Sequence, residues 1–183
     1  MFDLNNITTK MNSSLEAFQR NLSGIRAGRA SPSLLDQIKV EVYGSNMPLN
    51  QLATVSVQDS TLITVQVWDK GNVGSAEKAI RNSNLNLNPA SEGSLIRVPL
   101  PKLSEERRAE LVKICAEYAE QAKVAIRNIR RDAMDNIKKL QKDSEISEDE
   151  QKKYSDDVQQ ETDQFVKKID EQLEQKKSEI MAV

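Results

Sequence analysis

Three stretches of this 183-residue chain repeat apolar residues every three or four positions, and this period limits the fold more than any other sequence feature. Such a stretch forms a helix with one apolar stripe, which a lone helix cannot bury. The stretches cover residues 1–26, 104–142 and 147–183. Their apolar positions are Leu4, Ile7, Met11, Leu15, Phe18, Leu22 and Ile25, then Leu111, Cys115, Tyr118, Ala122, Ile126, Ile129, Ala133, Ile137 and Leu140, then Val158, Phe165, Ile169, Leu173 and Ile180. We therefore predict a bundle of three helices, two of them about 35 residues long.

The ends of these helices carry their own signals. Ser104 stands just before the second stretch, where its hydroxyl can cap the helix. The segment "SEDE" at 147–150 is a capping box and predicts the start of the third helix. Gly28 and Pro32 follow the first stretch and predict its end.

The middle of the chain, residues 31–103, has the alternating period of strands. "IKVEVYG" (38–44) and "TLITVQVWD" (61–69) alternate apolar with polar side chains, and "VSV" (55–57) and "SLIRVPL" (94–100) are shorter strands of the same kind. A turn is predicted at "GSNMP" (44–48), and a short helix over 75–84 with Ser75 as its N-cap.

The strand-rich segment separates the first helix from the other two, so it must be an insertion into the bundle. We predict an α+β protein with a three-helix bundle of residues 1–29 and 105–183 and an inserted β/α/β domain of residues 30–104. Two proline-containing connections, near 28–33 and 99–104, form a two-strand hinge in an elongated, L-like molecule. The predicted hinge residues are Gly28, Pro32, Pro99, Pro101 and Ser104.

Charge is unevenly distributed along the chain, although the net charge is only −2. Residues 121–142 contain seven basic and two acidic side chains, whereas residues 143–183 contain six basic and 13 acidic ones. A basic surface as local as this one suits a polyanion even in a mildly acidic protein.

The basic residues of the second helix form a strip, because Lys123, Arg127 and Arg131 follow one another at one-turn spacing and Arg130 lies beside them. The strip is either a solvated helix face or a nucleic-acid contact. Arg131 can pair with Asp135 four positions on, but Arg127 and Arg130 have no acid three or four positions away. Arginine suits phosphate because its planar guanidinium donates two hydrogen bonds at once.

Three further arginines have two interpretations each. Arg26 and Arg29 either cap the last carbonyls of the first helix or extend the basic surface. Arg108 stands in the first turn of a helix, which is unfavourable for a cation, so a partner is expected there, although Glu105 lies three positions before it.

Several classes of function are disfavoured. The chain has no histidine, and neither a phosphate-binding loop nor a GxGxxG motif, so neither catalysis nor a cofactor or metal is expected. Cys115 falls on an apolar stripe and predicts a buried thiol. No signal peptide and no apolar run of membrane-spanning length are expected, so the protein is predicted to be cytoplasmic. Trp68 either covers the second face of the sheet or faces a partner.

Five segments together resemble the bacterial ribosome recycling factor family. They are "IRAGRASPSLLD" (25–36), "LNPASEGSLIRVPLP" (87–101), "LSEERRAELVK" (103–113), "AIRNIRRDA" (125–133) and "EISEDE" (145–150). The resemblance covers the whole chain in order, and one mild departure is Ala27, where threonine is expected.

The resemblance implies a translation factor shaped roughly like transfer RNA, with a bundle and an inserted β/α/β domain. It implies binding to the post-termination ribosome across the transfer-RNA sites of the large subunit. With elongation factor G and GTP hydrolysis by that partner, the family splits ribosomes into subunits and frees messenger RNA. It implies ribosomal RNA contacts first by Arg127 and Arg130, then by Arg131, Arg108, Arg26 and Arg29, with Lys123 in the same strip. A monomer without a membrane partner or small-molecule substrate is expected.

Two rival functions start from the same residues. A general RNA-binding or chaperone protein would use these arginines without occupying one saturable site on the large subunit. A coiled-coil scaffold would self-associate and would tolerate alanine at Arg127 and Arg130.

Overall fold

The structure is a computed structural model that describes residues 1–27 and 29–182. The chain divides into two compact units. Unit 1 comprises Met1–Leu22 and Val112–Ser178, and unit 2 comprises Ser23–Leu111 and Glu179–Val183. These boundaries fall inside helices, whereas the predicted domain boundaries fall at residues 29/30 and 104/105; the predicted division stays a prediction. The predicted hinge residue Gly28 lies outside the described residues.

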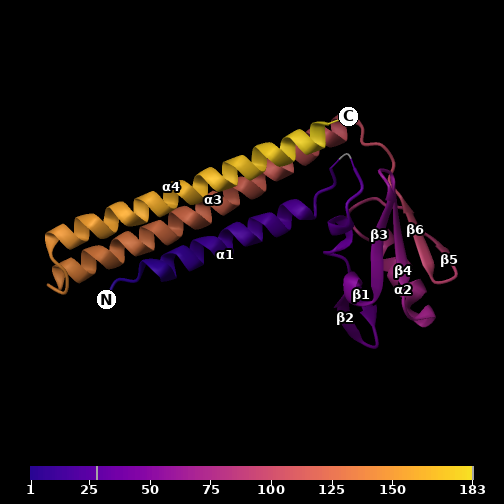
Figure 1. The fold of residues 1–183 in the computed structure, drawn as a ribbon, viewed down its shortest axis with the longest axis horizontal. Helices are drawn as coiled ribbons and strands as arrows, with labels where there is room; N and C mark the ends of the chain where they lie inside the picture. Colours follow the sequence, from indigo (N-terminus) through magenta and orange to yellow (C-terminus); the bar gives the residue numbers. More distant parts are fainter. Residues whose placement is uncertain (28, 183) are drawn as a thin grey trace. The chain divides into compact units, whose positions relative to one another are not determined.

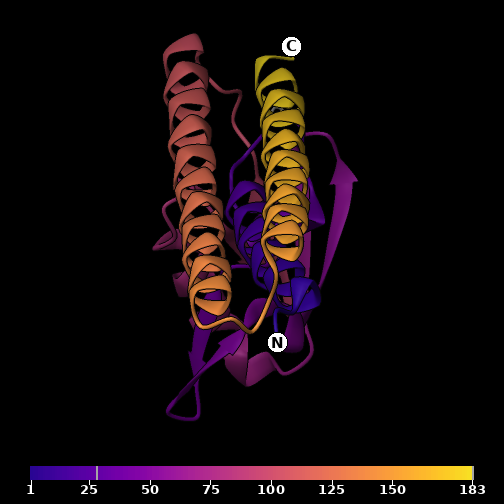
Figure 2. The ribbon, with the colours of Figure 1, turned by 90° about the vertical axis from the view of Figure 1, so that its left-hand side faces the viewer.

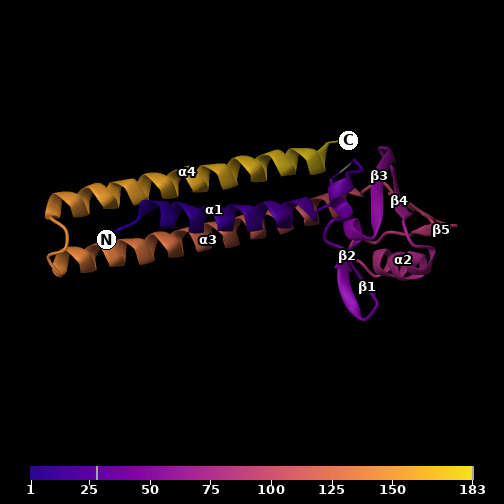
Figure 3. The ribbon, with the colours of Figure 1, turned by 60° about the horizontal axis from the view of Figure 1, so that its bottom comes forward.

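Three long helices give unit 1 its structure: α1 (Leu4–Ser23), α3 (Glu105–Lys142) and α4 (Glu148–Met181). They lie side by side, with α3 and α4 antiparallel across a short connection and α1 beside them (Figures 1 and 3). Figure 2 is turned so that the connection between α3 and α4 faces the reader. The predicted three-helix bundle is confirmed, although α1 ends at Ser23 rather than at residue 26.

The predicted apolar stripes bury most of their side chains. Every stripe residue predicted for α4 is buried, as are Met11, Leu15, Phe18 and Leu22 of α1 and Cys115 of α3. At one end of the bundle, Ala133, Ile137 and Val158 form a cluster covered by partly buried side chains. These covering residues are Phe2, Leu4, Ile7, Met134, Ile146 and Tyr154. No described helix is both long enough and apolar enough to cross a membrane.

The predicted helix caps are formed. The backbone N–H of Arg107 donates to Oγ of Ser104 at 3.1 Å, which caps α3. Ser147 and Glu150 make a reciprocal capping box: the Ser147 N–H donates to Oε2 of Glu150 at 2.8 Å, and the Glu150 N–H donates to Oγ of Ser147 at 3.2 Å. Both helices therefore begin where the sequence indicates.

Unit 2 contains two antiparallel sheets. The smaller sheet pairs β1 (Lys39–Val42) with β2 (Ser45–Pro48). The larger sheet has the order β3-β4-β6-β5. Its strands are β3 (Ala53–Asp59), β4 (Leu62–Val67), β5 (Ala90–Glu92) and β6 (Leu95–Pro99). The α+β fold class is therefore confirmed.

One face of these strands forms the core of unit 2. Val40, Ile63, Val65, Ile96 and Val98 are fully buried, which is the alternation predicted for the strands. Helix α2 (Val73–Arg81) packs near β1 and contributes Ala76 and Ile80 to this core.

Two local predictions in unit 2 are wrong. The turn predicted over 44–48 is confined to Tyr43 and Gly44, which both have positive φ, and Ser45–Pro48 continues as β2. Ser75 is not an N-cap, because α2 begins at Val73. The side chain of Asp69 accepts a hydrogen bond from the Gly71 N–H at 2.9 Å and starts a short 3-10 turn that leads into α2 two residues early.

Both connections predicted as hinges bind the same turn of the large sheet. The backbone N–H of Ala30 donates to the carbonyl oxygen of Ser60 at 3.0 Å, and that of Leu100 donates to the carbonyl oxygen of Thr61 at 2.6 Å. Pro32 is the first residue of a 3-10 helix, Pro32–Leu35, which suits its fixed φ. Hinge motion itself stays a prediction.

Candidate nucleic-acid interface

The predicted basic strip of α3 forms two rows. Arg130 and Lys123 are half-buried and contact α4, whereas Arg127 and Arg131 are exposed. This division follows from helix geometry, since Arg130 lies four positions after buried Ile126 and seven before buried Ile137. The inner row therefore borders the apolar stripe, and the outer row faces water.

Arg127, in the outer row, has one acidic partner among the described residues. Its Nη1 lies 2.8 Å from Oε1 of Glu120, with 53% and 59% of the two side chains exposed. Pairs as exposed as this one contribute only about 0–1 kcal/mol, so exchanging the carboxylate for a phosphate costs little. Glu120 was not predicted as a partner, because it lies seven positions, or two turns, before Arg127 rather than three or four.

Arg131, also in the outer row, is exposed and makes no hydrogen bond or ion pair within the described part of the chain. The predicted pair with Asp135 is therefore not formed there. Among the residues that the structure describes, the outer row therefore presents one weakly paired and one unpaired guanidinium to solvent.

The inner row is held by α4. Lys123 forms an ion pair with Asp170, and only 19% of the lysine side chain is exposed. Arg130 donates from Nε to Oε1 of Gln159 at 2.7 Å. Neither partner was found from the sequence, because no local spacing links residues of two different helices.

Arg26 and Arg108 lie together in unit 2. Arg26 is buried and donates a hydrogen bond to the carbonyl oxygen of Pro101, so it does not cap α1. Burial, and after it the charge of Arg108, lower the pKa of the Arg26 guanidinium. The Nε of Arg26 has no hydrogen-bond partner among the described residues.

The partner expected for Arg108 lies within the chain. Its Nη1 donates to the carbonyl oxygens of Ile180 at 2.9 Å and Ala182 at 2.6 Å, at the C-terminal end of α4. A cation is favourable at the negative end of a helix, so these bonds offset its unfavourable place in the first turn of α3. The neighbouring Arg107 pairs with Glu110 at 2.8 Å.

The remaining predicted residues are distributed in unit 2. Arg29 is exposed and has no side-chain partner among residues 1–27 and 29–182. Trp68 is 63% exposed, and its Nε1 donates to Oγ1 of Thr54, a residue of β3, at 3.0 Å. The indole is therefore bonded to the sheet and largely open to solvent, so covering the second face of the sheet stays a prediction. A partner for Trp68 stays a prediction.

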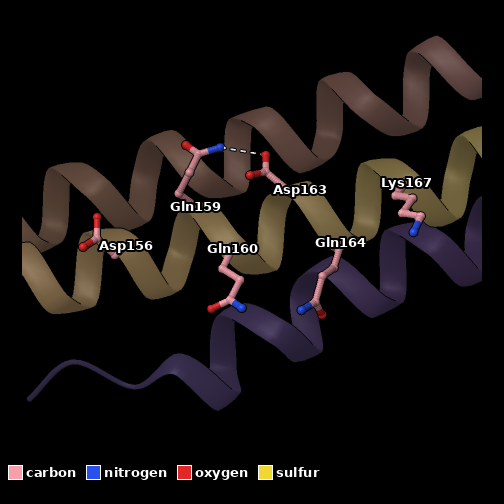
Figure 4. Close-up of a pocket in the computed structure, with 6 residues that line it drawn as sticks. All are labelled: Asp156, Gln159, Gln160, Asp163, Gln164 and Lys167. Atoms are coloured by element: carbon pink, nitrogen blue, oxygen red, sulfur yellow. Dashed lines mark hydrogen bonds between the residues drawn. The ribbon is translucent and has the colours of Figure 1, made fainter.

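The basic side chains of this strip are suited to holding anions. Within the described ranges, no group of His, Cys, Asp or Glu side chains is arranged to hold a metal ion. The hollow along α4 is shallow and is lined by Asp156, Gln159, Gln160, Asp163, Gln164 and Lys167 (Figure 4). The arginine strip can hold phosphate groups by charge and by paired hydrogen bonds.

Comparison with known proteins adds the family context. The profile described as ribosome recycling factor matches residues 18–181. The chain is 54% identical over 181 residues to the ribosome-recycling factor of Rhodospirillum centenum, covering 99% of this chain and 98% of that protein. It is 50% identical over 182 residues to the ribosome-recycling factor of Maricaulis maris, covering 100% and 98%.

Solved structures agree with the fold. A solution structure of a ribosome recycling factor matches with a TM-score of 0.79 and 42% identity, covering all of both chains. A second match has a TM-score of 0.68 and 46% identity, covering 97% of this chain and 96% of the other. It comes from models for the T. thermophilus ribosome recycling factor and the E. coli elongation factor G bound to the E. coli post-termination complex.

Proposed function

The chain belongs to the ribosome recycling factor family, and from this membership we propose that it binds the post-termination ribosome and acts there with elongation factor G. Together they release ribosomes from messenger RNA by splitting them into subunits, with GTP hydrolysis by elongation factor G. The observation that carries this proposal is the match of residues 18–181 to the family, with relatives aligned over nearly their whole length. The second structural match, a recycling factor with elongation factor G on the post-termination complex, supports the same partner and the same complex.

The protein's own part is to bind and to transmit force rather than to catalyse a reaction. The chain has no histidine, and the chemistry of its basic strip is phosphate binding. We place its action in the cytoplasm, where translating ribosomes are found. No cofactor is required for this role.

We assign the ribosomal RNA contact to the strip of α3. Arg127 and Arg131 present exposed guanidinium groups, and Arg130 and Lys123 border them. Folded RNA is recognised largely by its shape and its phosphates, so no base-specific contact is proposed. The secondary candidates for this contact are Arg26, Arg29 and Arg108. Two of them, Arg26 and Arg108, already donate hydrogen bonds to backbone carbonyls in unit 2.

The test is saturable binding to purified large ribosomal subunits across a salt series, for the wild type and for Arg127→Ala/Arg130→Ala. We expect weaker binding and a salt slope reduced by about 2, since each lost phosphate contact reduces it by about 1. The matched control is Lys152→Ala/Lys153→Ala, which removes the same charge from exposed positions of α4.

Three results would argue against the proposal. Unchanged binding by the arginine variant would move the RNA contact to Arg26, Arg29 and Arg108. Equal weakening by the lysine control would indicate a nonspecific electrostatic effect. Failure of transfer RNA to compete with the wild type would favour a general RNA-binding protein. Subunit splitting with elongation factor G and GTP, followed by light scattering, measures the function itself.

A further inference from the structure

The guanidinium of Arg130 is held by an amide rather than by a carboxylate. Its Nε donates to Oε1 of Gln159 at 2.7 Å, and Nε2 of Gln159 donates to Oδ1 of Asp163 at 2.9 Å. In Figure 4, Gln159 and Asp163 point to the same side of α4, toward α3, whereas Gln160 and Gln164 point toward α1. These two hydrogen bonds connect Arg130 on α3 through Gln159 to Asp163 on α4.

The orientation of the Gln159 amide is fixed by the chemistry of its two neighbours. A guanidinium only donates hydrogen bonds, and a carboxylate only accepts them. The amide must therefore present its oxygen to Arg130 and its NH₂ group to Asp163. Because Gln159 and Asp163 are four positions apart on one helix, the carboxylate lies where it can hold the amide.

The hydrogen bond to Gln159 leaves the two terminal nitrogens of Arg130 available. A guanidinium has five N–H donors, and the contact with Gln159 uses only the one at Nε. Within the described residues, Arg130 makes no ion pair within 4.0 Å, so no carboxylate neutralises its charge directly. The two terminal nitrogens remain able to bind a phosphate in the bidentate way.

We infer that Gln159 is a positioning residue for Arg130: it fixes the guanidinium through Nε and leaves the terminal nitrogens available for a phosphate of ribosomal RNA. The inference rests on the proposed function. A glutamine suits this role better than a glutamate would. A carboxylate at position 159 would pair with the guanidinium directly and compete with the phosphate.

The inference predicts different results for two substitutions. Gln159→Ala frees the side chain of Arg130, and ordering it on binding then weakens affinity for large subunits roughly 2- to 10-fold. The salt slope stays unchanged, because the charge of Arg130 still reaches the RNA. Gln159→Glu weakens binding more than Gln159→Ala does at low salt, because the new carboxylate pairs with Arg130. Gln160→Ala, on the neighbouring position of α4, is the matched control and binds like the wild type.

Coupling to Arg130 is the critical test. Arg130→Ala weakens binding and lowers the salt slope by about 1. In an Arg130→Ala background, Gln159→Ala has no further effect, since residues that act as a unit are not additive. In ¹⁵N spectra, the Nε–H of Arg130 is protected from exchange in the wild type and loses that protection in Gln159→Ala. Helix content and melting are recorded for every variant as a control for folding.

The failure of this inference can be told from failure of the proposed function. If Arg130→Ala weakens binding but Gln159→Ala does not, the positioning role is overturned and the RNA contact stands. If Gln159→Ala weakens binding equally with and without Arg130, Gln159 acts independently and the inference is overturned. If Arg130→Ala binds like the wild type, the assignment of the strip fails and the inference fails with it.

Discussion

The guanidinium of Arg26 donates a hydrogen bond to the carbonyl oxygen of Pro101, 75 positions further along the chain. The bond joins the segment just before the first predicted hinge connection, 28–33, to the second predicted connection, 99–104. Arg26 is buried and has only this hydrogen bond among the described residues, while its Nε remains unpaired. A buried charge with so few partners contributes little net stability, because its desolvation is costly.

The first prediction concerns this buried charge. Arg26→Met should keep the free energy of unfolding of unit 2 within about 1 kcal/mol of the wild-type value, because an apolar chain of similar length fills the site. Arg26→Ala should lose roughly 1–3 kcal/mol through lost packing and an unpaired Pro101 carbonyl. Fluorescence of Trp68, the single tryptophan, follows unfolding of unit 2. A methionine variant less stable than the alanine variant would contradict this account.

The second prediction concerns the core of the bundle. Ile126 is 0% exposed, and Ile126→Ala should reduce the free energy of unfolding by roughly 2–5 kcal/mol, because the substitution leaves a cavity. Val124, on the same helix, is 45% exposed, and Val124→Ala should change stability by about 0.5 kcal/mol. Thermal melting followed by circular dichroism compares the two. Similar losses would show that the α3 stripe is not tightly packed.

The third prediction concerns pH at the start of α4. Hydrogen bonds from the backbone N–H and then the hydroxyl of Ser147 lower the pKa of the Glu150 carboxyl below its ordinary 4.5. A lowered folded-state pKa means that the stabilisation is complete above the unfolded-state value and is lost as the pH falls through the folded-state value. The amide proton of Ser147, measured by NMR, should therefore titrate with a midpoint below 4.5.

A matched variant separates the capping box from other acidic groups. Glu150→Gln keeps an oxygen that accepts from Ser147 but cannot titrate in this range. The pH response of the Ser147 amide proton should then disappear while α4 keeps its start. A persistent response would assign the titration to another carboxyl.

The fourth prediction concerns Cys115. The thiol is fully buried, and burial raises its pKa, an effect that Lys176 and Lys177 partly oppose. A thiol reagent at pH 8 should therefore reach the thiol of the native protein only through transient opening, and react far more slowly than it does in denaturant. Because the folded-state pKa is raised, stability is unaffected below the unfolded-state pKa and declines as the pH rises through the folded-state value. Rapid labelling of the native protein would contradict the burial.

Helical period was sufficient to find the bundle because buried side chains recur along each helix at a fixed spacing. The capping residues Ser104 and Ser147 were found for a similar reason, since a cap lies within four positions of the groups that it binds. Strands β2 and β5 were missed because they are short and expose most of their side chains, so they show no alternation.

The contacts around the arginines could not be predicted in the same way. Gln159 and Asp170 approach α3 from another helix, and the two carbonyls that accept from Nη1 of Arg108 belong to Ile180 and Ala182, more than 70 positions away. Such partners depend on how the helices pack, which local spacing does not determine. Glu120 was within reach of sequence analysis, since side chains seven positions apart lie on one line of a helix.

The order of the elements along the chain determines which part of the protein can fold first during synthesis. The apolar core of unit 2 lies between Leu34 and Leu100, so it is complete soon after residue 100 has been made. Helix α1 is made first, yet its buried side chains need α3 and α4, which end at Lys142 and Met181. At a synthesis rate of about 5–20 residues per second, the apolar stripe of α1 stays exposed for on the order of ten seconds. The nascent chain is therefore most prone to aggregation at α1, and a holdase chaperone should bind Met11–Leu22 until α4 emerges.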